Sequence, residues 1–362
     1  MLHNKRKKVF VGLSGGVDSA VSAYLLLQLG YDVTAVFMQN WEQESQEGCT
    51  ADQDLADAMA ISAKLNIPLQ VVNFATNYWD EVFEEFLTAH KHGLTPNPDI
   101  LCNSKIKFKH FLNFALNNGA DFIATGHYAA VVEEGGLYKL QVPRDLKKDQ
   151  TYFLHALNQS QLSKSLFPLA DLCKDEVRKV ANKLLLTVHD KKDSTGICFI
   201  GNKNYNKFLS EYMLARAGEI VSATGDILGK HNGLIYYTIG QRRGIGIGGD
   251  SDYDPDPWYV VAKDQLANKL IVAQGTDNPL LYRKHLICRD IHWISGKAAS
   301  MPLKCSAKVR YRQQAQICMV EKIDGKYHVD FEKRQRAITP GQYLVLYDAD
   351  SCIGGGVISS DC

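Results

Sequence analysis

The chain has 362 residues, of which 45% are hydrophobic and 22% charged, and its formal net charge is +1. This length predicts two or three domains, and the composition is typical of a globular protein with sizeable apolar cores. The low net charge argues against a chain dominated by nucleic-acid binding. The sequence contains no recognisable signal peptide and no long apolar run, so we expect a cytoplasmic protein with no membrane partner.

Charge and cysteine are unevenly distributed along the chain. From residue 277 to the end there are 13 Lys and Arg against 9 Asp and Glu, so this part is mildly basic. Such a module is compatible with a nucleic-acid partner, although ordinary surface variation explains it equally well. The nine cysteines show no Cys-x-x-Cys spacing, which disfavours a disulfide scaffold, a zinc ribbon and an iron–sulfur site, and we expect no metal site built from clustered side chains.

The N-terminal part alternates short apolar runs with amphipathic segments. Apolar runs predict buried strands, and apolar residues at helical spacing predict helices. The predicted elements are strand 9–13, helix 17–29, strand 33–38, helix 51–65, strand 69–74, helix 78–90, helix 104–116 and strand 122–125. This alternation is typical of an α/β fold with a doubly wound parallel sheet, which binds ligands at the carboxyl ends of its strands.

The pattern of predicted elements changes after about residue 202. A predicted helix over 205–215 leads into Gly-rich, β-branched sequence, and short strands with regular turns continue to the end of the chain. Such spacing predicts a small β unit followed by a β-barrel or sandwich. We therefore expect three domains: a catalytic α/β domain over 1–204, a small central and mostly β domain over 205–276, and a C-terminal β-barrel over 277–362.

The stretch LSGGVDSAV, residues 13–21, has the composition of a phosphate-binding loop between a strand and a helix. Glycines let the backbone approach an anion, and the N–H groups at the start of the helix favour negative charge. Ser14 and Ser19 add hydroxyl donors, but the loop and the following helix lack the lysine of the Gly-x-x-x-x-Gly-Lys loop. Asp18 would repel phosphate, so we expect it to hold Mg²⁺ or to cap the helix. The structural alternative is a strand–turn–helix junction without a ligand.

Two cysteines in polar segments indicate a second chemistry. Cys102 lies in LTPNPDILCNSKIKF, residues 94–108, where prolines and asparagines predict a stiff loop that ends at a helix. A helix N-terminus and nearby lysines lower the pKa of a thiol. Cys198 lies in DSTGICFIG, residues 193–201, which also reads as a loop. Two loop thiols suit sulfur transfer, in which one carries a persulfide and the other releases its sulfur, leaving a transient disulfide. The alternative for each cysteine is a buried structural role.

The phosphate loop resembles that of the ATP pyrophosphatases, which transfer AMP to a carbonyl oxygen so that a nucleophile can displace it. Further stretches make almost the whole chain resemble the tRNA-specific 2-thiouridylase family. They are GLSGGVDSAVSAYLL, FMQNW, TPNPDILCNSKIKF, ATGHYA, KDQTYFLHAL, DSTGICFIG, YTIGQRRGIGIGG and IGGGVI. The resemblance implies an ATP-dependent sulfurtransferase that 2-thiolates the wobble uridine of tRNA for Lys, Glu and Gln, by adenylation of the uracil carbonyl and attack by persulfide sulfur.

The resemblance also implies roles for individual residues. Cys198 would carry the persulfide, Cys102 would be the second catalytic thiol, and Asp99 would be the general acid or base beside the target base. The residues implied to bind ATP, with Mg²⁺, are Gly12, Leu13, Ser14, Gly15, Gly16, Val17, Asp18, Ser19, Met38 and Gly126. The residues implied to contact tRNA are Asn97, Pro98, Asp99, His127, Lys148, Asp149, Gln150, Tyr311, Arg312 and Gln342. Sulfur would come from a cysteine desulfurase, directly or through a relay of carrier proteins.

Two other classes of function stay open on the residues themselves. Another ATP pyrophosphatase that forms a carbon–nitrogen bond would share the phosphate loop but would not need paired cysteines. A non-catalytic module that binds adenine nucleotides would not release AMP and pyrophosphate. The basic and aromatic stretch KVRYRQQ, residues 308–314, suits recognition of an RNA loop by stacking, but an ordinary strand with a charged face would look the same.

Overall fold

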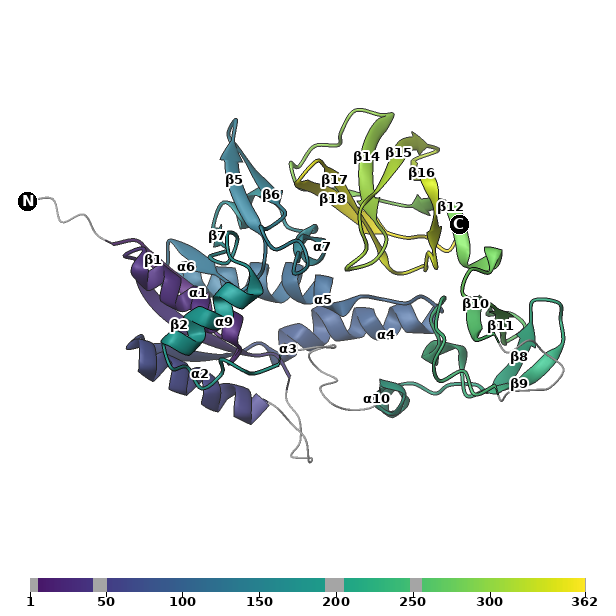
Figure 1. Cartoon of the computed structure of the whole chain (residues 1–362), viewed down its shortest axis with the longest axis horizontal. Helices are drawn as coiled ribbons and strands as arrows, with labels where there is room; N and C mark the ends of the chain where they lie inside the picture. Colours follow the sequence, from purple (N-terminus) through teal and green to yellow (C-terminus); the bar gives the residue numbers. More distant parts are fainter. Residues whose placement is uncertain (1–5, 42–50, 193–204, 248–255, 362) are drawn as a thin grey trace, which may run out of the picture.

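Five parallel strands form the sheet at one end of the molecule (Figure 1). Their order in space is β3-β2-β1-β4-β7, and each neighbouring pair runs in the same direction. After β1 the chain adds β2 and β3 on one side of that strand, and later it adds β4 and β7 on the other side. The direction in which strands are added therefore reverses between β1 and β4. Open α/β sheets bind ligands at such a reversal, beside the carboxyl ends of the strands. The predicted parallel sheet is confirmed.

The computed structural model describes residues 6–41, 51–192, 205–247 and 256–361. Up to residue 192 the elements are β1 Lys8–Gly12, α1 Val17–Gln28, β2 Asp32–Gln39, α2 Ala51–Leu65, β3 Leu69–Asn73, α3 Ala75–Tyr78, η1 Trp79–Phe83, α4 Glu84–Lys91, α5 Pro98–Leu101, η2 Cys102–Phe111, α6 Leu112–Asn117, β4 Phe122–Ala124, β5 Ala130–Glu134, β6 Leu137–Gln141, α7 Thr151–Leu154, α8 Gln159–Leu162, β7 Ser165–Leu166 and α9 Lys174–Lys183. Within the described ranges, no helix has both the length and the apolar character needed to cross a membrane.

Helices cover both faces of the parallel sheet because its central strands are apolar on both sides. Val9 and Val11 of β1 belong to a core shared with α1, α2 and α9. Phe10, between them, belongs to a second core with Phe83 and Phe111, which come from the helical segments on the opposite face. Successive side chains of a strand point to opposite faces, and strands covered on both sides are apolar throughout.

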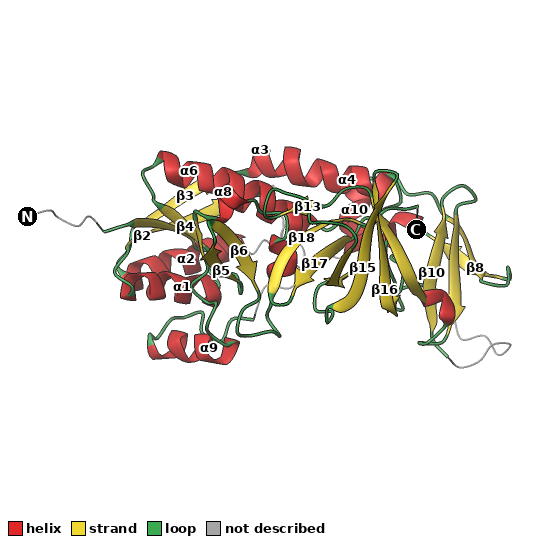
Figure 2. Cartoon of the chain, turned by 90° about the horizontal axis from the view of Figure 1, so that it is seen from above, coloured by secondary structure: helices red, strands yellow, loops and turns green. Residues whose placement is uncertain are grey.

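Two long helical segments build the second core, and each contains a π-helical part. The first is α3-η1-α4 and the second is α5-η2-α6. The sequence predicts helices over 78–90 and 104–116, so both predicted helices exist but begin earlier in the chain. The second begins at Pro98, whose fixed φ suits the first turn of a helix. Figure 2 shows α3 and α4 running from the parallel sheet towards the β-rich part of the molecule.

A four-stranded sheet of order β10-β11-β8-β9 forms the far end of the molecule (Figure 1). Its strands and the helices before and between them are α10 Tyr205–Tyr212, β8 Gly218–Ser222, β9 Ile227–His231, η3 Leu234–Tyr236, β10 Trp258–Asp264 and β11 Lys269–Gln274. The mostly β character expected of this part of the chain is confirmed. The sheet contacts the end of α4, because a Cβ added to Gly93 would stand 2.1 Å from Nε2 of Gln265.

The C-terminal strands form a nine-stranded sheet that curves towards a barrel. Its C-terminal elements are η4 Pro279–Leu281, β12 Tyr282–Cys288, β13 His292–Trp293, β14 Leu303–Lys308, β15 Gln316–Ile323, β16 Lys326–Arg336, β17 Tyr343–Asp348 and β18 Ser351–Val357. A bridge between Cys288 and Ile358 brings β12 back to the end of β18. On the same edge, opposite β17, the start of β18 pairs with β6, which pairs with β5. Nothing local in residues 130–141 predicts that these two strands join the C-terminal sheet.

A buried ion pair also joins the α/β part to the barrel. Lys308 Nζ on β14 lies 2.6 Å from Oδ2 of Asp149, and their side chains are 15% and 5% exposed. The other oxygen of Asp149 accepts hydrogen bonds from the backbone N–H and the hydroxyl of Thr151. Both carboxylate oxygens of Asp149 therefore have partners. Lys308 compensates the buried negative charge, and without this lysine the charge would be unpaired inside the protein.

Replacing Lys308 with Met should lower the free energy of unfolding by about 3–5 kcal/mol, because Asp149 would become an uncompensated buried charge. The matched control is Lys304→Met on the same strand, whose partner Glu332 is 3.5 Å away with both side chains largely exposed. Its effect should stay within about 1 kcal/mol. Urea unfolding followed by tryptophan fluorescence measures both variants, and equal shifts would contradict the structural role of the Asp149 pair.

Candidate active site

The loop after β1 and the residues after β4 lie side by side where the strand order reverses. Gly126 approaches the loop so closely that an added Cβ would stand 2.8 Å from the backbone nitrogen of Ser19. A Cβ added to Gly12 would stand 3.0 Å from Cε of Met38, near the end of β2. The structure therefore brings these four predicted ATP-binding residues to one place at the carboxyl edge of the sheet.

Residues 14–19 form a tight loop with internal hydrogen bonds. Ser19 Oγ accepts from the N–H of Ser14 at 3.2 Å and donates to the carbonyl of Gly16 at 3.0 Å. Gly15 has a φ of +71°, and an added Cβ would stand 2.3 Å from the carbonyl oxygen of Asp54 in α2. Glycine is needed there for both its conformation and its size. Since α1 begins at Val17, its first N–H groups lie at this edge without partners inside the helix, as an anion requires.

Asp18 is neutralised by a lysine from a distant part of the chain. Lys174 Nζ lies 2.6 and 2.7 Å from the two carboxylate oxygens, and the Tyr128 hydroxyl donates to the same carboxylate at 3.0 Å. The prediction that Asp18 caps the helix is wrong, because Gly16 is the N-cap residue and no side chain in the described part of the chain caps α1. Among the described residues, no group of three or more His, Cys, Asp or Glu side chains could hold a metal ion.

A second lysine contacts the loop from the other side. Lys191 Nζ donates to the carbonyl of Gly15 at 3.1 Å and to Asp54 at 2.7 Å, and it also pairs with Asp57. Partial burial lowers the pKa of Lys191, but the hydrogen bonds and charges of the two aspartates outweigh burial and raise the pKa above its ordinary value. Lys191 therefore stays protonated at neutral pH, and the two aspartates balance its charge while it holds the carbonyl of Gly15.

Sequence reasoning missed both lysines. The loop itself lacks a lysine, and Lys174 and Lys191 lie far along the chain. The local sequence signals only that a helix starts at Lys174, where the backbone N–H of Cys173 is capped by Glu176. A helix start does not identify the loop against which the helix packs, so only the tertiary structure reveals these two partners.

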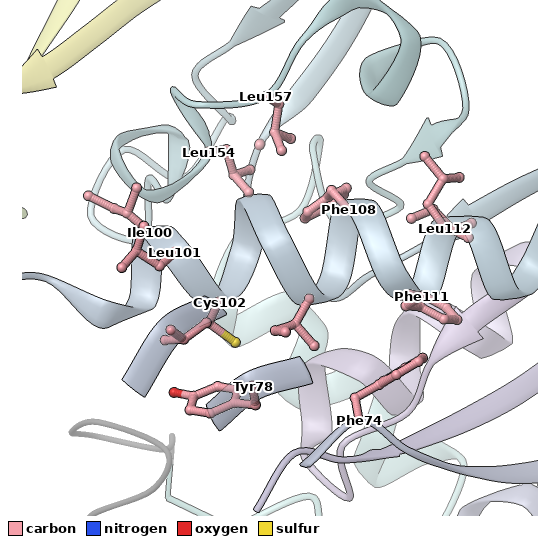
Figure 3. Close-up of a cluster of buried hydrophobic side chains, with 14 of the residues drawn as sticks. Phe74, Tyr78, Ile100, Leu101, Cys102, Phe108, Phe111, Leu112, Leu154 and Leu157 are labelled. Carbon is pink, nitrogen blue, oxygen red and sulfur yellow. The ribbon is translucent and has the colours of Figure 1, made fainter. Parts of the chain in front are cut away.

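Cys102 lies inside a helical segment and not in a loop (Figure 3). The predicted loop position is wrong because the helix already begins at Pro98, four residues earlier. Cys102 is 3% exposed as a residue and packs in the core with Tyr78 and Phe108. The same segment, η2, ends at Phe111, which lies 3.6 Å from a Cβ added to Gly12, so η2 links the thiol to the phosphate loop.

The other predicted residues of the same stretch lie at the start of α5. Asn97 precedes the first turn of α5, and Pro98 and Asp99 lie within it. Burial raises the pKa of the Asp99 carboxyl above its ordinary value, and the charge of Lys107 offsets part of that effect. Cys198, the predicted persulfide carrier, lies outside the described residues.

Three of the predicted tRNA-contacting residues are held by other parts of the protein. His127 is buried beside Phe108, shares a hydrogen bond of 2.8 Å with Thr125, and burial lowers its pKa well below the ordinary value. Gln150 accepts from the N–H of Tyr128 at 2.9 Å and so supports the tyrosine that holds Asp18. The third, Asp149, forms the buried pair with the barrel.

The remaining predicted tRNA-contacting residues lie nearer the surface. Lys148 is half-buried, and Arg312 is exposed with a φ of +66°. Tyr311 packs on Phe153 with ring centroids 4.4 Å apart, and the Arg312 guanidinium lies over the Tyr311 ring at 5.5 Å. Gln342 donates from Nε2 to the loop before Asn97. Lys148, Tyr311 and Arg312 thus remain candidates for direct contact with an RNA.

Known families and relatives match the chain along nearly its whole length. The matching family models are described as tRNA methyl transferase HUP domain (residues 7–202), tRNA methyl transferase PRC-barrel domain (206–274) and aminomethyltransferase beta-barrel domain (283–358). The tRNA-specific 2-thiouridylase MnmA of Legionella pneumophila (strain Paris) is 53% identical over 355 residues, which cover 98% of both chains. The chain belongs to the tRNA-specific 2-thiouridylase family. Another member, from Pseudomonas fluorescens (strain Pf0-1), is 52% identical over 98% of this chain and 95% of its own length.

Family membership confirms the resemblance carried by the sequence motifs. The three matched segments follow the order of the parallel sheet, the four-stranded sheet and the barrel along the chain. The third segment ends at residue 358, where the barrel strand β18 has just been completed. The family therefore combines an α/β domain built on a parallel sheet with two β-rich units, as the predicted elements along the chain suggest.

Gly15→Ala should weaken ATP binding about tenfold to a hundredfold, because the added Cβ would collide with Asp54 and the backbone would be strained by about 1–3 kcal/mol. Gly30→Ala is the matched control: its φ is +82°, but an added Cβ would meet no atom within 4 Å. Isothermal titration with Mg-ATP measures both affinities. Equal weakening by the two substitutions would contradict the view that the phosphate loop depends on its contact with α2.

Proposed function

We propose that this chain is an ATP-dependent sulfurtransferase that replaces the carbon-2 oxygen of the wobble uridine of tRNA with sulfur. The proposed acceptors are the tRNAs for Lys, Glu and Gln, and the products from ATP are AMP and pyrophosphate. The observation that carries the proposal is the preformed phosphate loop, flanked by Lys174 and Lys191, in a chain that belongs to the tRNA-specific 2-thiouridylase family. The loop is the part of the chain that would bind ATP, and family membership supports tRNA as the substrate.

ATP makes a poor reaction centre reactive. The carbonyl at carbon 2 of uracil is urea-like, so sulfur cannot readily displace its oxygen. Transfer of AMP onto that oxygen releases pyrophosphate and turns the oxygen into part of a good leaving group. Lys174 neutralises Asp18, so this carboxylate does not repel the phosphates, and the first N–H groups of α1 supply the fixed positive dipole ends that stabilise such a transition state.

Mg²⁺ would accompany ATP and balance further phosphate charge. Asp18 is the carboxylate of the loop that would face it, since Mg²⁺ prefers one or two carboxylates together with phosphate oxygens and water. Lys174 and Tyr128 hold this carboxylate in the meantime. The chain's own contribution is therefore to keep Asp18 oriented and its charge compensated.

Sulfur would be delivered by the two cysteines. Cys198 would receive a persulfide sulfur from a cysteine desulfurase, directly or through carrier proteins. Its terminal sulfur attacks carbon 2, and AMP leaves with the former uridine oxygen. Cys102 then attacks Sγ of Cys198, the S–S bond breaks with its electron pair moving to the transferred sulfur, and a disulfide between the cysteines remains. Because Cys102 is 3% exposed as a residue, its segment must open when tRNA binds.

The function is tested by nucleoside mass spectrometry of unmodified glutamate tRNA after incubation with the protein, Mg-ATP and a persulfide donor. The product should contain a uridine heavier by the exchange of oxygen for sulfur. Cys102→Ser and Cys198→Ser should each reduce it to background, because neither hydroxyl can carry or release sulfur. Ser19→Ala should slow product formation about tenfold through the lost hydroxyl.

Cys173→Ser is the matched control, because serine caps the start of α9 well and should leave the yield unchanged. Iodoacetamide should label Cys102 slowly without tRNA and faster with it. Release of AMP and pyrophosphate without thiolated uridine in both cysteine variants and the wild type would favour a nitrogen ligase. Absence of ATP turnover in well-folded protein with competent tRNA would contradict the proposed function altogether.

The pH dependence of thiolation should report Asp99. Since burial raises its pKa, a step that needs the carboxylate gains rate as the pH rises through that raised pKa, and a step that needs the acid loses rate over the same interval. Asp99→Asn cannot change its protonation, so it should lower the rate about 10²- to 10⁴-fold and remove that limb of the profile. The control is Asp80→Asn, an exposed carboxylate. The rates are measured in single turnovers. If the Asp99→Asn variant kept this limb of the pH profile, Asp99 would not be the group that titrates.

A further inference from the structure

We propose that the barrel positions the loop that holds the target base. Residues 340–342, here named the barrel loop, hold residues 94–97, here named the base loop, in position. Gly341 and Gln342 act as positioning residues for thiolation. The inference rests on the proposed function for its catalytic consequence. The contact between the two loops is itself a property of the tRNA-free protein. Three observations carry it: the hydrogen bonds between the loops, the close approach at Gly341 and the rigidity of the barrel side.

Hydrogen bonds run in both directions between the two loops. The N–H of Thr95 donates to the carbonyl of Pro340 at 2.9 Å. Gln342 Nε2 donates to the carbonyls of Thr95 at 2.9 Å and Pro96 at 3.3 Å. Proline has no N–H, so the base loop, with prolines at 96 and 98, has few donors of its own. The barrel loop supplies the donor that the base loop lacks.

The backbone of Gly341 packs directly on the base loop. Its φ is +90°, and an added Cβ would stand 2.7 Å from the backbone nitrogen of Thr95 and 2.8 Å from Cβ of Leu94. Distances below 3.0 Å cannot be accommodated against backbone atoms without displacement. Any larger residue at position 341 would therefore push the base loop away from the barrel.

The barrel loop is a rigid support because it is tied to the end of β18. The N–H of Gly341 donates to the carbonyl of Ile358 at 2.9 Å, and the N–H of Ile358 donates to the carbonyl of Gln342 at 2.8 Å. Thr339, just before the loop, is 2% exposed. A support tied to β18 by two backbone hydrogen bonds transmits its position to the segment that it contacts.

The position of the base loop determines where α5 begins. Thr95 lies three residues before Pro98, the first residue of α5, and that helix carries Asp99 and leads into Cys102. A displaced base loop would move both groups relative to the phosphate loop. Small displacements of reacting groups cost rate without loss of binding. Gln342 was expected to contact tRNA, but its amide nitrogen already faces two carbonyls of the base loop, so we infer that it acts through this loop.

Four variants test the inference. Gly341→Ala introduces the collision, and Gly325→Ala is its matched control, because Gly325 has a φ of +79° but an added Cβ would meet no atom within 4 Å. Gln342→Ala removes the donor, and it keeps the test valid if Gly341→Ala folds poorly. Gln342→Glu keeps the shape but places a carboxylate against two carbonyls. The measurements are amide hydrogen exchange of residues 94–99 without tRNA, and kcat and KM for tRNA thiolation.

Gly341→Ala and Gln342→Ala should each accelerate amide exchange of residues 94–99 about tenfold and lower kcat about tenfold, while KM stays within about twofold of the wild type. A factor of ten corresponds to about one net hydrogen bond. Gly325→Ala should change neither. Gln342→Glu should lose more activity than Gln342→Ala at neutral pH, where the carboxyl is ionised and cannot donate, and should regain part of it only as the pH falls towards about 4.3, the ordinary pKa of glutamate.

Unchanged exchange in both Gly341→Ala and Gln342→Ala would overturn the positioning role. A raised KM with unchanged kcat in Gln342→Ala would also overturn it, in favour of direct contact with tRNA. Wild-type protein that forms no thiolated uridine would overturn the proposed function and the catalytic part of this inference. That failure is distinguishable, because the exchange measurement requires neither tRNA nor activity.

Discussion

A phosphate loop that contains a carboxylate and no lysine can bind an anion only if the carboxylate is neutralised from elsewhere in the chain. Here Lys174 reaches Asp18, and Lys191 reaches the carbonyl of Gly15. Both lysines come from the last part of the α/β region, so this region must be completed before the loop is electrostatically competent. The ion pairs therefore connect the folding of the parallel sheet to its chemistry.

The second requirement is that a large RNA substrate meets this loop in one fixed orientation. Strands β5 and β6 leave the α/β region and extend the barrel sheet, and the buried pair Asp149–Lys308 links the two regions again. Continuous hydrogen bonding and a buried charge pair resist separation better than a flexible linker. The barrel thus keeps a fixed place beside the α/β region and contacts the loop before Asn97.

Much of this arrangement follows from the sequence, because its signals are local. Alternating apolar runs predict the parallel sheet, and the composition of residues 13–21 predicts the phosphate loop. The partners Lys174 and Lys191 could not be predicted, since charge pairing across the fold leaves no local pattern. The position of Cys102 inside a helical segment was also missed, because the helix starts at Pro98, and a proline there fits a loop and a first helical turn equally well. The joining of β6 to β18 likewise depends on tertiary contact.

The central claim is that ATP is used to make the uridine oxygen leave. It is tested most directly with tRNA whose wobble uridine carries a heavy oxygen isotope at carbon 2, by mass spectrometry of the released AMP after one turnover. The account predicts that each AMP formed with a thiolated uridine carries the heavy oxygen in its phosphate group. Unlabelled AMP alongside thiolated uridine would contradict adenylation of the base and would require a different role for the phosphate loop.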